Sequence, residues 1–129
     1  MSARTILVVE DEFLIRFMLA DSLREIGYQV LEAANGDEGL AVLLSGQAVD
    51  LMVTDVRMPG SIDGIDLTRR SKSLAPARPV IVCSAHLFEP ESYPADAFLP
   101  KPYTFAELAN VIERLTGEPW QTNSQTRSA

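Results

Sequence analysis

The chain has few of the residues that cross-link many small proteins through disulfides or metal ions, and few of those that bind nucleic acid. It contains one cysteine, Cys83, and one histidine, His86, which excludes an internal disulfide and any multi-cysteine metal site. Basic residues are scarce, with 11 Lys and Arg against 18 Asp and Glu and a net charge of −7. This balance argues against direct electrostatic binding to nucleic acid or to an anionic membrane. It permits a basic partner, or a cation held by clustered carboxylates.

Long hydrophobic runs are also missing. No apolar run approaches the roughly 18 residues that a membrane span needs, and no signal peptide is visible at the N-terminus. We therefore expect a cytoplasmic protein. The length of 129 residues fits one domain. We expect this domain to cover residues 1–116, followed by a disordered tail over residues 117–129, where all periodicity is lost.

Short apolar runs alternate with helical patterns along the chain. The apolar runs predict strands at residues 5–9, 29–33, 51–54, 79–83 and 97–99. Helical patterns cover residues 13–26, 64–74, a segment capped by Asn35 and ending near residue 44, and a last helix that follows the capping pair Thr104 and Glu107. Continuously apolar strands are typical of sheets covered on both faces. The pattern predicts an α/β fold with a doubly wound parallel sheet and helices on both faces.

Residues that can carry chemistry follow the ends of these strands. Glu10 and Asp11 follow the first strand, Asp55 the third and Ser84 the fourth, and the fifth leads to Lys101. In open α/β sheets ligands bind at this carboxyl edge. Gathered carboxylates repel one another, and an all-oxygen cluster of this kind suits Mg²⁺. A lysine ammonium and a serine hydroxyl can contact phosphoryl oxygens, so the set predicts phosphoryl transfer.

The segments that contain these residues resemble the receiver domain of bacterial two-component response regulators. They are Val8–Glu12 (VVEDE), Val53–Pro59 (VTDVRMP), Val82–Ala85 (VCSA) and Leu99–Pro102 (LPKP). Each motif alone is weak, but all four occur in order at the expected element ends. The resemblance covers roughly residues 4–116 and implies a flavodoxin-like sheet with strand order 2-1-3-4-5.

The resemblance also implies roles for individual residues. Asp55 is expected to be the phosphoacceptor. The expected Mg²⁺ ligands are the carboxylates of Asp11 and Asp55 and the backbone carbonyl of Arg57, with Glu10 acting through water.

Further roles concern the response to phosphorylation. Lys101 is expected to pair with the phosphoryl group, and its bond to Pro102 is expected to be cis. Ser84 would close onto the phosphoryl oxygens while Phe98 changes rotamer. Arg57 and His86 would tune the rate of self-dephosphorylation.

The sequence departs from the family pattern in two loops. The turn between Asp55 and the Asp63–Gly64 pair is one residue longer than usual. Only sixteen residues separate Ser84 from Lys101, and this stretch contains Pro90, Pro94 and Pro100. Because proline interrupts helices, we expect the fourth helix of the family to be shortened or absent.

Other classes of protein fit the residues less well. An aspartyl phosphatase would need an acid two residues after its nucleophile, where this chain has Arg57. A flavodoxin-like flavin carrier would need a phosphate-binding loop in place of the acidic Glu10–Glu12 segment. A transcription factor is disfavoured because no second domain follows. The remaining alternatives are a stand-alone receiver and a receiver excised from a hybrid kinase or multidomain regulator.

The expected partners are a sensor histidine kinase or a histidine phosphotransferase. The chain itself is expected to be a monomer or a weak homodimer. On the first helix, Phe13, Phe17 and Ala20 are predicted to lie opposite the sheet, as a docking patch for the helical phosphodonor or for a second copy. The sheet-facing side is predicted to carry Ile15, Leu19, Ser22 and Ile26, flanked by Met18 and Leu23. Alternatively, Phe13 packs against Pro102 and Tyr103.

Overall fold

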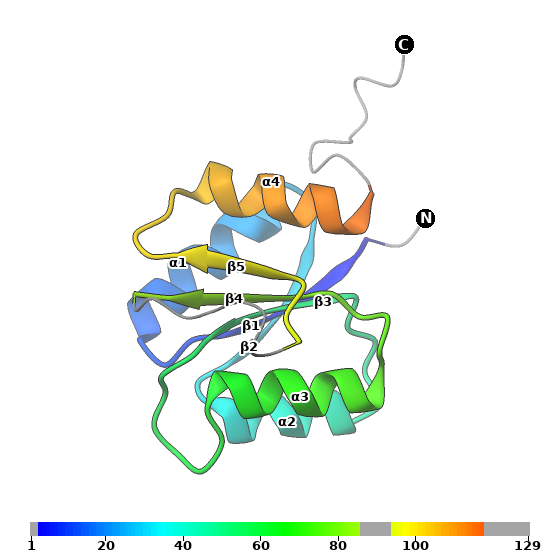
Figure 1. The fold of residues 1–129 in the computed structure, drawn as a ribbon. Helices are drawn as coiled ribbons and strands as arrows, with labels where there is room; N and C mark the ends of the chain where they lie inside the picture. The colour runs from blue at the N-terminus through cyan, green and yellow to red at the C-terminus, as the bar shows by residue number, and fades with distance from the viewer. Residues whose placement is uncertain (1–2, 86–93, 118–129) are drawn as a thin grey trace.

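Five strands and four helices make up the part of the chain that the computed structural model describes, residues 3–85 and 94–117 (Figure 1). The strands are β1 Thr5–Val9, β2 Gln29–Ala33, β3 Leu51–Asp55, β4 Val80–Ser84 and β5 Ala97–Pro100. The helices are α1 Phe13–Glu25, α2 Gly36–Leu44, α3 Gly64–Leu74 and α4 Phe105–Thr116. Each of these elements was predicted from the sequence, with bounds that differ by one residue or less.

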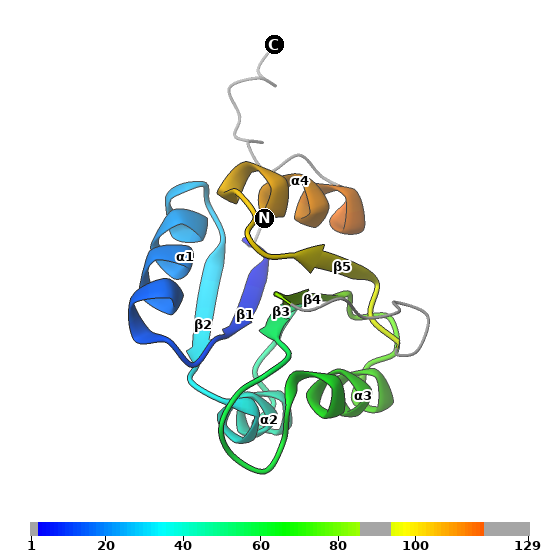
Figure 2. The same cartoon turned by 60° about the vertical axis from the view of Figure 1, so that its left-hand side comes forward.

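All five strands run parallel, in the order β2-β1-β3-β4-β5. This confirms the predicted doubly wound sheet. Helices α1 and α4 cover one face, and α2 and α3 cover the other (Figures 1 and 2). Within the described residues, no helix is both long and apolar enough to cross a membrane.

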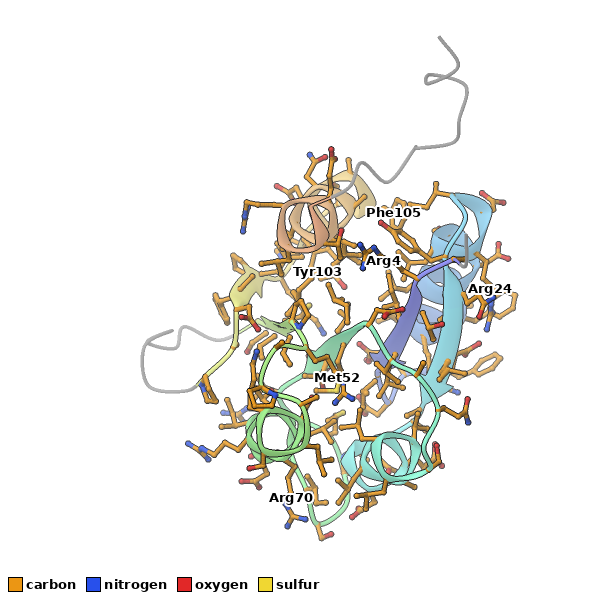
Figure 3. The ribbon with its side chains drawn as sticks, turned by 90° about the vertical axis from the view of Figure 1, so that its right-hand side faces the viewer. Arg4, Arg24, Met52, Arg70, Tyr103 and Phe105 are labelled. Atoms are coloured by element: carbon orange, nitrogen blue, oxygen red, sulfur yellow. The ribbon has the colours of Figure 1, made fainter. Side chains whose placement is uncertain are left out.

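Each face of the sheet has its own hydrophobic core. Successive residues of β1 point to opposite faces of the sheet. Ile6 and Val8 pack under α1 and α4, whereas Leu7 and Val9 pack under α2 and α3. Met52 belongs to the second core and lies between the sheet and these two helices (Figure 3). Because both faces are covered, the strands are apolar at most positions, as the sequence predicted.

Side-chain caps begin three of the helices. Asn35 accepts a hydrogen bond from the Glu38 amide at the start of α2, and Asp63 accepts one from the Asp66 amide at the start of α3. At α4, Thr104 and Glu107 form the complete predicted capping box. These caps satisfy amide groups that have no partner inside the helix.

The predicted orientation of α1 is wrong in part: Leu19 and Leu23 pack against the core as predicted, but other residues of the predicted stripe do not. Ala20 and Leu23 are fully buried, whereas Ile15 and Met18 are exposed. The stripe that faces the sheet is Arg16, Ala20 and Leu23, spaced i, i+4 and i+7. Hydrophobicity alone misplaces this stripe because it contains an arginine, and because the small Ala20 side chain fits where helix and sheet lie close together.

The predicted docking patch changes accordingly. Ala20 is not part of any exposed surface, since it is buried against the sheet. Phe13 and Phe17 are exposed, and their rings stack with centroids 6.1 Å apart. Leu14, Ile15 and Met18 are also exposed. The N-terminal half of α1 therefore presents an apolar surface of five large side chains, which we call the α1 surface.

Two sequence-based expectations lie largely outside the described residues. The first is the shortened or absent helix between β4 and β5, a segment that falls for the most part on residues 86–93. The second is the disordered tail, which falls on residues 118–129. Gly117, the first residue of the predicted tail, adopts a left-handed conformation (φ 77°) and ends α4, as is typical of glycine after a helix.

Gly64 ties the loop after β3 to the strand end. Its amide donates to the Val56 carbonyl at 2.8 Å. A Cβ atom at this position would overlap the backbone carbonyl oxygen of Asp55. Only glycine therefore permits this close approach of α3 to the end of β3.

We predict that Gly64→Ala lowers the free energy of unfolding by about 2–3 kcal/mol, because the added methyl group must displace backbone atoms. Gly46→Ala is the control, since its φ is 90° but nothing lies near its Cβ position. That substitution should cost about 1 kcal/mol through backbone conformation alone. Urea unfolding of both variants tests the prediction, and equal losses would contradict it.

Candidate functional site

Three carboxylates meet at the carboxyl edge of the sheet. Glu10 and Asp11 follow β1, and Asp55 ends β3. These strands are neighbours, with Val9 opposite Thr54. One carboxylate oxygen from each of the three residues lies within 4.8 Å of the others. The predicted acidic cluster is therefore present in the structure.

Lys101 supplies a positive charge to this cluster. Its ammonium lies 3.0 Å from Asp55 Oδ1 and 3.8 Å from Glu10 Oε1. The Lys101 amide donates to the Ser84 carbonyl at 2.9 Å, which fixes the loop after β5 against β4. The Lys101–Pro102 peptide bond is cis, as predicted. Cation and carboxylates are thus brought together from three strands that are distant in the sequence.

Burial and charge shift the pKa values of two of these groups. The pKa of the Glu10 carboxyl is raised, chiefly because burial penalises its charged form, while its hydrogen bond from the Glu12 amide partly opposes this. Burial alone would lower the pKa of Lys101. Its hydrogen bond to Asp55 and the charges of Asp55 and Glu10 outweigh burial and raise the Lys101 pKa. The site therefore favours a charged Lys101, which interacts with the carboxylates of both Asp55 and Glu10.

The donor set fits a hard divalent cation. Carboxylate oxygens from Glu10, Asp11 and Asp55 converge, and the Asp11 side chain is exposed to solvent. Mg²⁺ binds through one or two carboxylates and retains several water ligands, so a partly exposed all-oxygen cluster matches its preference.

The other predicted site residues occupy distinct positions around the cluster. Ser84 is buried at the end of β4, one strand away from Asp55. Phe98 is half-buried in β5 and packs against the core under α2 and α3. Arg57 is exposed in the loop after β3. His86 lies outside the described residues.

Sequence reasoning missed residues that support the site without belonging to it. The Arg16 guanidinium donates to the backbone carbonyl of Glu10 at 2.8 Å. Asp37, in the first turn of α2, accepts hydrogen bonds from the amide and hydroxyl of Ser61 in the loop after β3. Polar residues at ordinary helix positions carry no sequence signal for such contacts, except that Arg16 lies one turn before the buried Ala20.

Comparison with known proteins matches residues 6–113 to the response regulator receiver domain. The chain belongs to this family. It is 37% identical over 119 residues to the DNA-binding transcriptional regulator NtrC of Azospirillum brasilense, covering 88% of this chain and 24% of NtrC. The sensor kinase CckA of Brucella abortus is 37% identical over 117 residues, covering 86% of this chain and 12% of CckA.

A solved structure of this family has the same fold. The response regulator TrrA of Thermotoga maritima, in complex with Mg²⁺ and BeF, superposes with a TM-score of 0.78 at 33% identity, covering 87% of this chain and 98% of TrrA. The chain spans about a quarter of the length of NtrC. It is a receiver domain homologous to those of NtrC and CckA, and this is consistent with both a separate receiver and part of a longer regulator.

The raised pKa of Glu10 predicts a stability effect in metal-free protein. The folded state binds the Glu10 proton more tightly than the unfolded chain does, so ionisation of Glu10 destabilises the fold as the pH rises through its folded-state pKa. Glu10→Gln, which is neutral throughout, should therefore melt at a higher temperature than wild type at pH 7 in a chelator. The difference should vanish below about pH 4, where glutamate is protonated in both states.

Thermal unfolding across this pH range is the measurement. Glu12→Gln, an exposed change in the same loop, is the control and should leave the melting temperature unchanged. A Glu10→Gln protein that is less stable than wild type at pH 7 without metal would contradict the assignment of burial as the dominant cause.

Proposed function

We propose that this receiver domain accepts a phosphoryl group on Asp55 from a phosphohistidine and transmits the change by protein contact. The observation that carries the proposal is the position of Asp55. Its carboxylate lies within the acidic cluster and 3.0 Å from the Lys101 ammonium. A carboxylate so placed has a cation on one side and a metal-binding set of oxygens on the other.

The transfer is a displacement at phosphorus. A carboxylate oxygen of Asp55 forms a bond to the phosphorus atom while the bond from phosphorus to the imidazole nitrogen breaks. The leaving imidazole keeps the electron pair and takes a proton from solvent. Asp11, Asp55 and the backbone carbonyl of Arg57 would hold Mg²⁺, with Glu10 acting through water. The bound ion would neutralise charge on the phosphoryl oxygens.

The protein's own residues position the group and respond to it. Lys101 is already charged and adjacent, so it can pair with a phosphoryl oxygen without a large movement. The Ser84 hydroxyl donates to another phosphoryl oxygen. The loop after β5 moves together with Ser84, because the Lys101 amide donates a hydrogen bond to the Ser84 carbonyl. Phe98, in the neighbouring strand, changes rotamer with this movement. The domain is thus a two-state switch biased by a local charge.

The proposal makes the domain a signalling phosphoacceptor rather than a catalyst acting on a separate substrate. An aspartyl phosphatase is disfavoured because Arg57 occupies the position of the second acid. Arg57, together with His86, would instead set how long the acyl phosphate lasts. The donor is a sensor histidine kinase or a histidine phosphotransferase, and we place the exchange in the cytoplasm.

Three substitutions separate the proposed roles. Asp55→Asn should abolish phosphorylation by a small phosphodonor such as acetyl phosphate with Mg²⁺, because the nucleophile is removed. Asp11→Ala should nearly abolish it through loss of a metal ligand. Lys101→Ala should leave Mg²⁺ affinity intact but remove the conformational response. Intact-protein mass after incubation measures labelling, and robust labelling of Asp55→Asn would overturn the assignment.

We also propose that the phosphodonor docks on the α1 surface. A groove of about 570 Å³ adjoins this surface and is lined by Ile15, Met18, Lys101, Pro102, Tyr103 and their neighbours. Because Lys101 belongs both to the groove and to the site, a partner seated there lies directly beside Asp55. Phe13 stacks on Phe17 and remains exposed, which favours docking over the alternative in which it packs on Pro102 and Tyr103.

Phe17→Glu should slow phosphorylation by a phosphorylated donor protein at least severalfold, because a charge is placed within an apolar contact. Its phosphorylation by acetyl phosphate should match wild type. Leu44→Glu, an exposed apolar position on α2, is the matched control. Equal rates for both variants with the donor protein would show that the α1 surface is not used, and a change in size-exclusion behaviour would indicate a second copy instead.

A further inference from the structure

Arg16 lies on the side of α1 that faces the sheet, where apolar residues are usual. It lies on the same stripe as the buried Ala20 and Leu23, and only 15% of its side chain is exposed. An arginine on a core-facing stripe costs desolvation unless its donors are used. The contacts of its guanidinium therefore indicate what the residue does.

The guanidinium connects the acidic loop to β2. Nη1 donates to the backbone carbonyl of Glu10 at 2.8 Å, and Nε pairs with Glu32 Oε1 at 3.3 Å. The guanidinium carbon, Cζ, lies 5.5 Å from the centre of the Phe13 ring. Glu32 lies on β2 opposite Val8, so Arg16 anchors the end of β1 to a neighbouring strand.

These contacts fix Glu10 from several sides. Its amide donates to the Ala33 carbonyl at 3.1 Å, and its Oε2 accepts from the Glu12 amide at 3.1 Å. The bond from Arg16 to the Glu10 carbonyl holds the peptide that joins Glu10 to Asp11. Because Asp11 follows this peptide, the orientation of the peptide sets the backbone position from which the Asp11 side chain extends.

We infer that Arg16 is a positioning residue that holds the loop Glu10–Glu12 in the geometry that binds the divalent cation. The inference rests on the Mg²⁺ site of the proposed function. Removal of a residue that bonds to a metal ligand commonly lowers the metal affinity by about 10- to 100-fold. Arg16 makes no contact with the Asp55 carboxylate in this structure, so its effect should fall on the cation and not on the nucleophile.

Arg24 provides a matched control on the same helix. It pairs with the other oxygen of Glu32 at 3.2 Å and donates to the Val30 carbonyl at 3.0 Å. Figure 3 labels Arg24 beside α1 and β2. Arg24→Gln therefore removes an arginine, a positive charge and a Glu32 ion pair without touching Glu10. Any effect of Arg16→Gln beyond that of Arg24→Gln belongs to the bond with the Glu10 carbonyl.

The test is calorimetric titration of Mg²⁺ into the wild-type chain and both variants. We expect the Kd of Arg16→Gln to rise about tenfold, and that of Arg24→Gln to stay within twofold of wild type. Labelling of Arg16→Gln by acetyl phosphate should return to the wild-type rate at saturating Mg²⁺. Arg16→Lys should be intermediate, because an ammonium keeps the charge but lacks the planar fork that reaches both partners.

A second readout needs no metal. In chelator, the Glu12 amide should exchange its hydrogen faster in Arg16→Gln than in Arg24→Gln, because the loop that holds its acceptor is released. If Arg16→Gln does not fold, Glu32→Gln weakens the same anchor and should raise the Kd by a smaller factor. Equal Kd values and equal exchange in the Arg16 and Arg24 variants would overturn the inference. Absence of Mg²⁺ binding by wild type would instead overturn the proposed function.

Discussion

The crowding of three carboxylates at one edge of a parallel sheet is the constraint on which the rest of the site depends. Because the strand order places β1 beside β3, the carboxylates of Glu10, Asp11 and Asp55 lie close together. Like charges at this separation destabilise the fold unless a cation or a proton intervenes. Lys101 provides part of the compensation from the loop after β5. A divalent cation would complete it, because it would bring the positive charge that the metal-free site lacks.

This arrangement makes the support around the cluster as important as the cluster itself. Gly64 brings α3 close to the backbone of Asp55, and Arg16 bonds the carbonyl of Glu10. The Lys101 amide joins the loop after β5 to Ser84. Each contact fixes a backbone position from which a charged side chain projects.

The fold and the acidic cluster could be predicted from the sequence because both depend on simple patterns. Continuous apolar runs indicated buried parallel strands, and in such a sheet the residues that follow neighbouring strands must meet. The orientation of α1 could be predicted in this way only in part. Its buried stripe includes Arg16, and hydrophobicity treats an arginine as a solvent-facing residue. The hydrogen bond from Ser61 to Asp37 was equally hidden, because it joins a loop to a helix whose relative positions depend on tertiary packing.

The central claim is that the charge-compensated carboxylate of Asp55 forms an acyl phosphate. The most direct measurement is to incubate the protein with acetyl phosphate and Mg²⁺, reduce it with borohydride and sequence its peptides by mass spectrometry. Reduction converts a phosphorylated aspartate to homoserine and leaves free carboxylates unchanged. The account predicts homoserine at position 55 alone, and only when Mg²⁺ is present. Homoserine at position 11 in place of 55, or at position 55 to the same extent in chelator, would contradict it.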